Sequence, residues 1–136
     1  MSTELSRAIK GDLDWFHDCA VRSIDFDWGS TVTLRITVVC PADLGRPDWN
    51  GRTLVIVAKD VVLLDYELRM SSRHDSIDSI REGIYSTNLR ADVRRYAAAG
   101  GPLDYPSLSI SFSSGSSLEM FCEEPEIELL ACSPPV

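Results

Sequence analysis

The two histidines of the chain each precede an aspartate, and these dipeptides are the residues best suited to chemistry. They are His17-Asp18 and His74-Asp75. Two imidazoles with carboxylates can hold a metal ion or a small ligand, so His17, Asp18 and His74 form a candidate ligand site. Such a site requires two loops far apart in the sequence to meet. The alternative is that each aspartate makes a turn hydrogen bond while its histidine packs or faces solvent.

Cysteine is the second candidate for chemistry. Cys19 follows His17 by two positions, and on an extended segment such side chains point the same way, so the imidazole could activate a thiolate. The chain has four cysteines, no CxxC pair and no zinc spacing. Because no orienting third residue, phosphate-binding glycine loop or nucleophile elbow is present, we predict no catalytic residue, no dedicated metal site and no cofactor. The thiols are expected to be small buried groups near strands.

Residues suited to contact with another protein occur in a loop and near the C-terminus. Trp49 lies in segment 40–51, where prolines and glycines indicate a loop. A tryptophan there can anchor a partner or fold back as a local lid. Glu123, Glu124 and Glu126 lie beside the last expected strand, where acidic groups suit a solvated edge. These four are the candidate partner-binding residues.

The charge balance narrows the class of partner. The formal net charge is −8, and the arginines Arg90, Arg94 and Arg95 are interrupted by Asp92. Nucleic acids and anionic membranes require a basic patch, so neither is an expected partner, whereas a basic protein is. The N-terminus has no apolar secretory core and no apolar run is long enough to span a bilayer. We therefore expect a cytoplasmic protein.

Alternating apolar and polar residues predict antiparallel strands. Segments 20–28 and 32–38, with Gly29-Ser30 between them, predict a hairpin. Segment 53–58 is apolar on both faces and indicates a central strand. Further strands are expected at 61–70, 108–112, 118–122 and 126–131.

Helices are expected to be few and short. Segments 2–10 and 88–96 have capping residues and apolar stripes at helical spacing. Segment 76–86 is ambiguous, because its isoleucines recur at helical spacing while a strand over 80–85 also fits. The expected fold class is α+β, predominantly antiparallel β: a sandwich or strongly curved sheet with one to three short helices. It forms a single domain over 1–132, followed by a flexible tail at 133–136.

The layout of the chain resembles a known group of proteins. The sequence WFHDC at 15–19, the strands 21–27 and 32–38, and the closing hairpin 108–123 resemble small bacterial domains that open with an apolar-His-Asp turn. This layout is similar to immunity proteins of polymorphic toxin systems and their uncharacterised relatives. The resemblance implies binding and neutralisation of a toxin domain without catalysis, and it carries over no binding residues. The long segment 69–106 matches no part of it.

Three hypotheses for function follow from the sequence. The first is a non-catalytic protein-binding domain, such as an immunity protein that uses acidic and aromatic surface to block a basic toxin domain. The second is a domain that binds a small ligand or a metal ion around His17, Asp18 and His74, either as a binding domain or as an enzyme. The third is a structural subunit of a larger complex.

Overall fold

The computed structural model describes residues 14–67, 75–82, 87–100, 107–123 and 125–130. Within these ranges the chain forms eight β-strands, one α-helix and one 3-10 turn. In chain order the elements are η1 (Asp14–Phe16), β1 (Ala20–Trp28), β2 (Val32–Val39), β3 (Thr53–Ala58), β4 (Leu63–Glu67), β5 (Asp75–Glu82), α2 (Thr87–Ala98), β6 (Ser107–Phe112), β7 (Ser117–Phe121) and β8 (Glu126–Leu129). The predicted α+β class, mostly antiparallel β, is confirmed.

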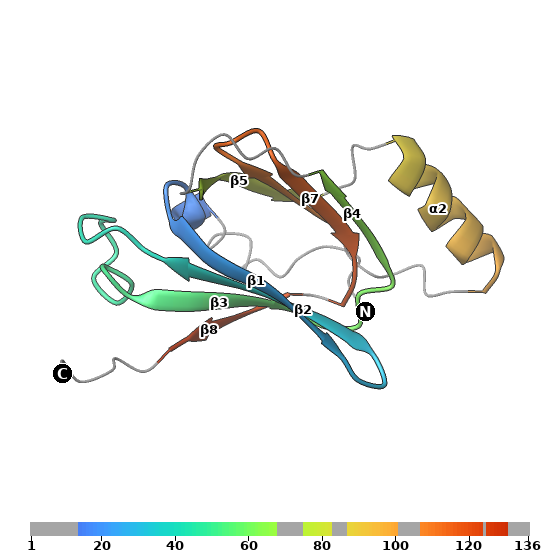
Figure 1. The fold of residues 1–136 in the computed structure, drawn as a ribbon, viewed down its shortest axis with the longest axis horizontal. Coiled ribbons are helices and arrows are strands. Elements are labelled where there is room, and N and C mark those ends of the chain that lie inside the picture. The colour runs from blue at the N-terminus through green and yellow to red at the C-terminus, as the bar shows by residue number, and fades with distance from the viewer. Residues whose placement is uncertain (1–13, 68–74, 83–86, 101–106, 124, 131–136) are drawn as a thin grey trace.

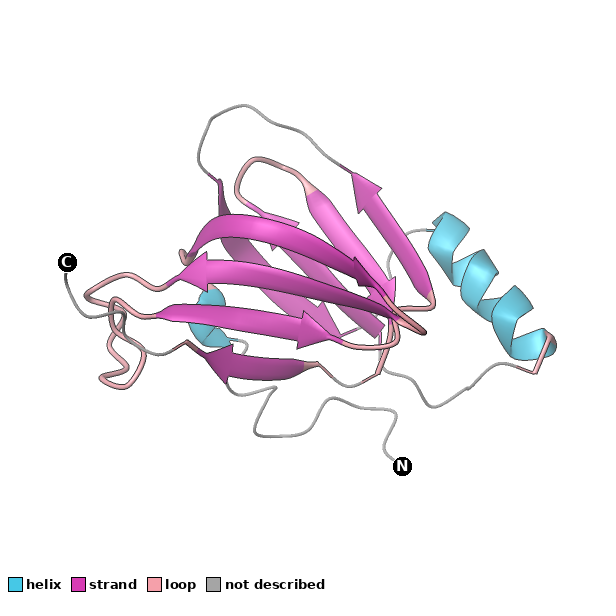
Figure 2. Cartoon of the chain, turned by 60° about the horizontal axis from the view of Figure 1, so that its bottom comes forward, coloured by secondary structure: helices cyan, strands magenta, loops and turns pink. Residues whose placement is uncertain are grey.

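All eight strands belong to one open antiparallel sheet that bends into two halves. The strand order is β4-β7-β6-β5-β1-β2-β3-β8. β1 and β2 are paired along nearly their full length, whereas β1 meets β5 only through Ala20 with Ser76 and Val21 with Asp75. Beyond this short joint the β5-β6-β7-β4 half turns across the β1-β2-β3-β8 half (Figures 1 and 2). Of the two layouts that the sequence left open, a sandwich or a strongly curved sheet, the structure has one open sheet that bends strongly.

The core lies between the inner faces of the two halves. A single apolar cluster contains buried side chains from both. The first half, β1-β2-β3-β8, contributes Leu34, Ile36, Val38, Leu54 and Ile56. The second half, β5-β6-β7-β4, contributes Ile77, Ile80, Leu108, Ile110, Leu118 and Met120. Burial of one such side chain stabilises the fold by roughly 1.5–3 kcal/mol, so the halves stay closed without a disulfide among the described cysteines, all of which are free.

Segment 76–86 is the place where helical spacing misleads. Residues 75–82 form strand β5, and a β-bulge between Ile77 and Ser79 shifts its pairing with β6. A bulge inserts one extra residue, so Ile77 and Ile80, three apart, both face the core and are buried. The i, i+3 spacing that favoured a helix thus arises from a strand that contains a β-bulge. The helical alternative is wrong over the described part of this segment.

The helix predicted over 88–96 is confirmed as α2. It packs beside β4 (Figure 1), and Leu89 forms a second small cluster with Phe121 of β7. The ring of Tyr96 meets Phe121 edge-on at 6.1 Å. Gly100 has φ +92° just after the helix, a left-handed position suited to a helix C-terminus. The predicted helix 2–10 and the tail 133–136 lie outside the described residues.

The ends of the sheet are short strands with acidic side chains. β4 carries Asp65 and Glu67, and β8 carries Glu126 and Glu128. Charged groups on an edge strand discourage pairing with another sheet. β3, between β2 and β8, is buried on both faces as its apolar sequence predicted. Over the described residues, no helix has the length and apolar character that crossing a membrane requires.

Candidate functional site

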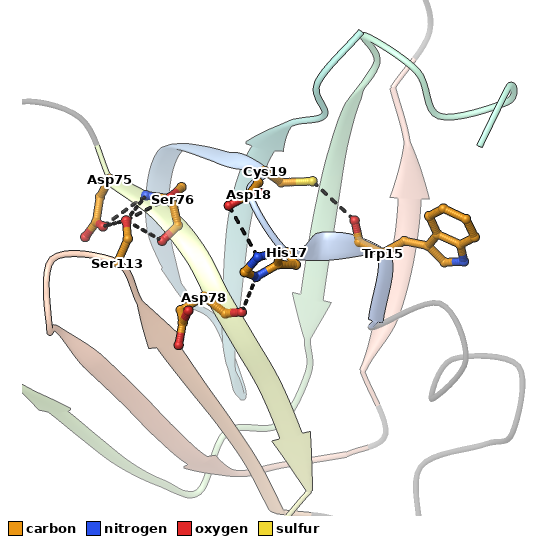
Figure 3. Close-up of polar contacts among 8 residues, drawn as sticks. All are labelled: Trp15, His17, Asp18, Cys19, Asp75, Ser76, Asp78 and Ser113. Carbon is orange, nitrogen blue, oxygen red and sulfur yellow. Dashed lines mark hydrogen bonds and ion pairs between the residues drawn. The ribbon is translucent and has the colours of Figure 1, made fainter. Parts of the chain in front are cut away.

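The His17-Asp18 dipeptide forms the corner that leads from η1 into β1. Asp18 has φ +68°, a left-handed conformation that aspartate tolerates better than most residues. Its N–H donates to the Ile77 carbonyl at 2.9 Å, and the Nδ1–H of His17 donates to the Asp78 carbonyl at 2.7 Å (Figure 3). These bonds hold the corner against β5, close to the joint of the two sheet halves. The dipeptide therefore connects the start of β1 to β5 through hydrogen bonds.

The electrostatics of His17 follow from the same contacts. The hydrogen bond to Asp78 and the carboxylate of Asp18, whose Oδ1 is 3.5 Å from Nε2, raise the pKa of His17 above 6.5. The ring is solvent-exposed. His74 lies outside the described residues, and in the described part of the chain no three His, Cys, Asp or Glu side chains converge as metal ligands. The proposed meeting of the two HD dipeptides stays a prediction.

Cys19 does not face His17. Because Asp18 adopts a left-handed conformation, the extended alternation expected between residues 17 and 19 is broken. Cys19 is fully buried, whereas His17 is exposed, and the Cys19 thiol points to the Trp15 carbonyl at 3.7 Å (Figure 3). Burial and the neighbouring Cys40 raise the pKa of Cys19 to about 12. A thiol held this way is protonated at neutral pH, which is the opposite of an activated nucleophile.

Asp75 is the centre of a hydrogen-bond network that the sequence did not reveal. Its Oδ1 accepts from the N–H groups of Ser76 and Ser114, both at 3.0 Å, and from the Ser113 hydroxyl at 3.1 Å. Its Oδ2 accepts from the Ser114 hydroxyl at 2.6 Å. Figure 3 shows the part of this network around Ser113. The network ties the start of β5 to the turn between β6 and β7, and its sequence signal is the serine run at that turn.

Trp49 is not exposed. Only 5% of it is accessible, its ring packs against Phe16 at 5.3 Å, and the Arg46 guanidinium lies 3.7 Å from the ring centre. The alternative in which it folds back over the core is the arrangement in the structure. Trp49 thus packs against Phe16 of η1 and is unavailable as a surface anchor.

The acidic candidates near the C-terminus are exposed where they are described. Glu123 and Glu126 both face solvent, and Glu126 pairs with Lys59 at 3.1 Å. The N–H of Glu123 donates to the Lys59 carbonyl at 3.0 Å. Glu124 lies outside the described residues. These acids therefore border the chain crossing at 59–62, which joins the two sheet halves.

An aromatic cleft lies where the open end of the β1–β2 hairpin meets segment 61–64. It is an apolar hollow of about 320 Å³ lined by Phe26, Trp28, Val32, Val61, Val62, Leu63 and Leu64. Phe26 and Trp28 lie opposite Leu34 and Val32 in the register, so they share the core-facing side of β1. Yet Trp28 is 78% exposed and Phe26 39% exposed. The β1–β2 hairpin extends past the cover of the second half, and its inner face stays open there.

The two rings of the cleft form an ordered pair. Their centres are 6.5 Å apart with an interplanar angle of 30°, within the usual range of aromatic stacking. Val61 and Val62, which line the cleft, are held by backbone hydrogen bonds: the N–H of Val61 donates to the Val32 carbonyl and the N–H of Val62 donates to the Phe121 carbonyl. The sequence predicts Phe26 and Trp28 only as part of the strand over 20–28, and the site was not among the candidates. Its one signal is a tryptophan directly before the hairpin turn.

Comparisons with protein-family models, curated proteins and solved structures find no match to this chain.

Proposed function

We propose that this chain is a non-catalytic protein-binding domain whose contact surface is the aromatic cleft. The observation that carries the proposal is the stacked pair Phe26 and Trp28, presented to solvent beside an apolar hollow. Large exposed aromatics next to a pocket are the usual anchors of protein interfaces. Burial of the Phe26 and Trp28 rings by a partner would remove apolar surface from water and so stabilise the complex.

The net charge of the chain favours a basic partner. Asp25 and Asp27 alternate with Phe26 and Trp28 along β1 and therefore point to the opposite face of the sheet from the two rings, and Asp65 likewise alternates with Leu64. Asp27 has Arg35 at 3.7 Å, so part of this charge is balanced within the chain. The net charge of the whole chain is −8. A basic partner that inserts an apolar side chain into the cleft complements both the apolar hollow and the negative charge of the chain.

The resemblance of the chain to bacterial immunity proteins supports the same class of function. On that basis we propose a toxin domain with a basic surface as the partner and neutralisation by occlusion as the mechanism. We place this action in the cytoplasm. We propose that Glu123 and Glu126, which border segment 59–62, contribute acidic contacts to the partner. Trp28, which is exposed, takes the role of aromatic anchor that the sequence suggested for the buried Trp49.

Affinity capture from the source cells tests this function. Tagged wild-type chain and the Trp28→Ala variant are used as baits at low and high salt, and the captured proteins are identified by mass spectrometry. The proposal expects a basic protein that is retained by the wild type at low salt, depleted at high salt and depleted by Trp28→Ala. Leu129→Ala is the matched control, because Leu129 is 45% exposed on β8 at the far edge of the sheet. A partner captured equally by all three baits would contradict the proposed surface.

A further inference from the structure

Two buried thiols of this chain are in direct contact. The Sγ atoms of Cys19 and Cys40 are 3.5 Å apart. The register of β1 with β2 pairs Ala20 with Val39, so one further step places Cys19 opposite Cys40. The N–H of Cys40 donates to the Arg52 carbonyl, which makes this a cross-strand position without mutual backbone bonds. Opposite Cα atoms at such positions are typically about 4.5 Å apart, within the roughly 4.4–6.8 Å that a disulfide spans.

We propose that Cys19 and Cys40 are a dithiol that a disulfide oxidant converts into a cross-strand disulfide. One thiolate attacks a sulfur of the oxidant, its S–S bond breaks and one thiol leaves. The second cysteine then attacks the mixed disulfide, the Cys19–Cys40 bond forms and a second thiol leaves. Two electrons and two protons pass from the pair to the oxidant. The sulfurs must approach by roughly 1.5 Å to reach bonding distance, which side-chain rotation can supply.

The surroundings of the pair determine how it reacts. Both side chains are buried, and burial raises the pKa of each thiol. The folded protein therefore exposes little thiolate, and oxidation proceeds when this end of the hairpin opens or while the chain refolds. A reducing cytosol keeps the pair as thiols, and an environment that contains disulfide oxidants closes it. Closure links the η1 corner to the start of the loop that carries Trp49.

Thiol mapping after refolding tests this proposal. The experiment uses a Cys132→Ser background, because Cys132 lies outside the described residues. Cys122, which is also fully buried, remains as an internal control. The unfolded chain is refolded in a buffer of oxidised and reduced glutathione, and folding is verified by circular dichroism. Free thiols are then alkylated and the peptides are mapped by mass spectrometry. Cys19→Ser and Cys40→Ala in the same background are the paired controls.

The expected product has lost two hydrogens, links Cys19 to Cys40 and retains a free thiol at Cys122. Closing a loop of this size raises Tm by about 5–10 °C, and a reductant reverses the rise. Each paired control lacks one partner of the pair, so it forms no internal bridge and carries at most a mixed disulfide with glutathione at its remaining cysteine. A refolded chain with both thiols unmodified, a bridge that includes Cys122, or a Cys19–Cys40 bridge that lowers Tm would overturn the proposal.

Discussion

Removal of the Asp75 carboxylate should loosen the joint between β5 and the β6–β7 turn. Asp75→Ala loses the four hydrogen bonds from Ser76, Ser113 and Ser114. Asp75→Asn keeps an oxygen at the Oδ1 position, where three of the four bonds end, and loses the charge and the Ser114 hydroxyl bond. Since bonds to a charged acceptor contribute about 1.5–3 kcal/mol when buried and less near the surface, we expect losses of about 2–4 kcal/mol for Asp75→Ala and about 1–2 kcal/mol for Asp75→Asn.

Urea unfolding at neutral pH measures both values, with the midpoint and slope compared among variants. Asp43→Asn is the matched control, because it removes one negative charge from an exposed position in the loop between β2 and β3. The control should stay within about 0.5 kcal/mol of the wild type. An Asp75→Ala variant as stable as this control would refute the structural role assigned to the network.

Acidification provides a second test of Asp75. Burial alone would raise the pKa of this carboxyl group, but the hydrogen bonds from Ser114, Ser113 and Ser76 outweigh burial and lower its pKa below 3.8. A group whose pKa is lowered by folding stabilises the fold above its unfolded value, and this stabilisation is lost as pH falls through the folded value. The stability gap between wild type and Asp75→Asn should therefore shrink below pH 3.8. A gap that widens would contradict the assignment.

Three further predictions concern the corner, the loop and the bulge. The imidazole of His17 should titrate with a midpoint above pH 6.5 by NMR. The difference in free energy of unfolding between wild type and His17→Gln should be largest below pH 6.5 and shrink as pH rises through that midpoint. A midpoint below pH 6.5 would contradict the contacts of His17 with Asp78 and Asp18. Trp49→Ala should lower the free energy of unfolding by about 3–5 kcal/mol, because the ring is buried; a loss under 1 kcal/mol would show an exposed ring. Ile77→Ala and Ile80→Ala should each cost about 2–5 kcal/mol, and Asp78→Ala, between them, under about 1 kcal/mol; a large loss at Asp78 would contradict the bulge.

Much of the strand framework was predictable because local alternation decides it. The hairpin of β1 and β2, the doubly buried β3 and the β6–β7 hairpin all follow from period-two patterns and turn residues. The pattern failed where a bulge changes the period. Ile77 and Ile80 in β5, and likewise Val21 and Ile24 around the bulge of β1, face inward at a spacing of three. A single sequence does not distinguish this spacing from one helical turn.

Two of the three tryptophans, Trp49 and Trp28, show why the candidate surface was harder to predict. Trp49 sits in a loop and would be expected outside, but Phe16 and Arg46 cover it. Trp28 sits at an inward-facing strand position, but the second sheet half ends before it and leaves it open. Exposure here depends on where one layer of the sheet stops relative to the other. That is a property of the long-range fold, which period and composition do not encode.

Binding at the aromatic cleft is tested most directly by the affinity of the purified partner for the chain with and without Trp28. Titration calorimetry with wild type, Trp28→Ala and Leu129→Ala gives the three Kd values, and thermal unfolding verifies that each variant is folded. We expect Trp28→Ala to weaken binding at least about thirtyfold, in line with loss of a hot-spot residue at about 2 kcal/mol or more, and Leu129→Ala to leave Kd unchanged. An unchanged Kd for a folded Trp28→Ala variant would contradict the cleft as the binding surface.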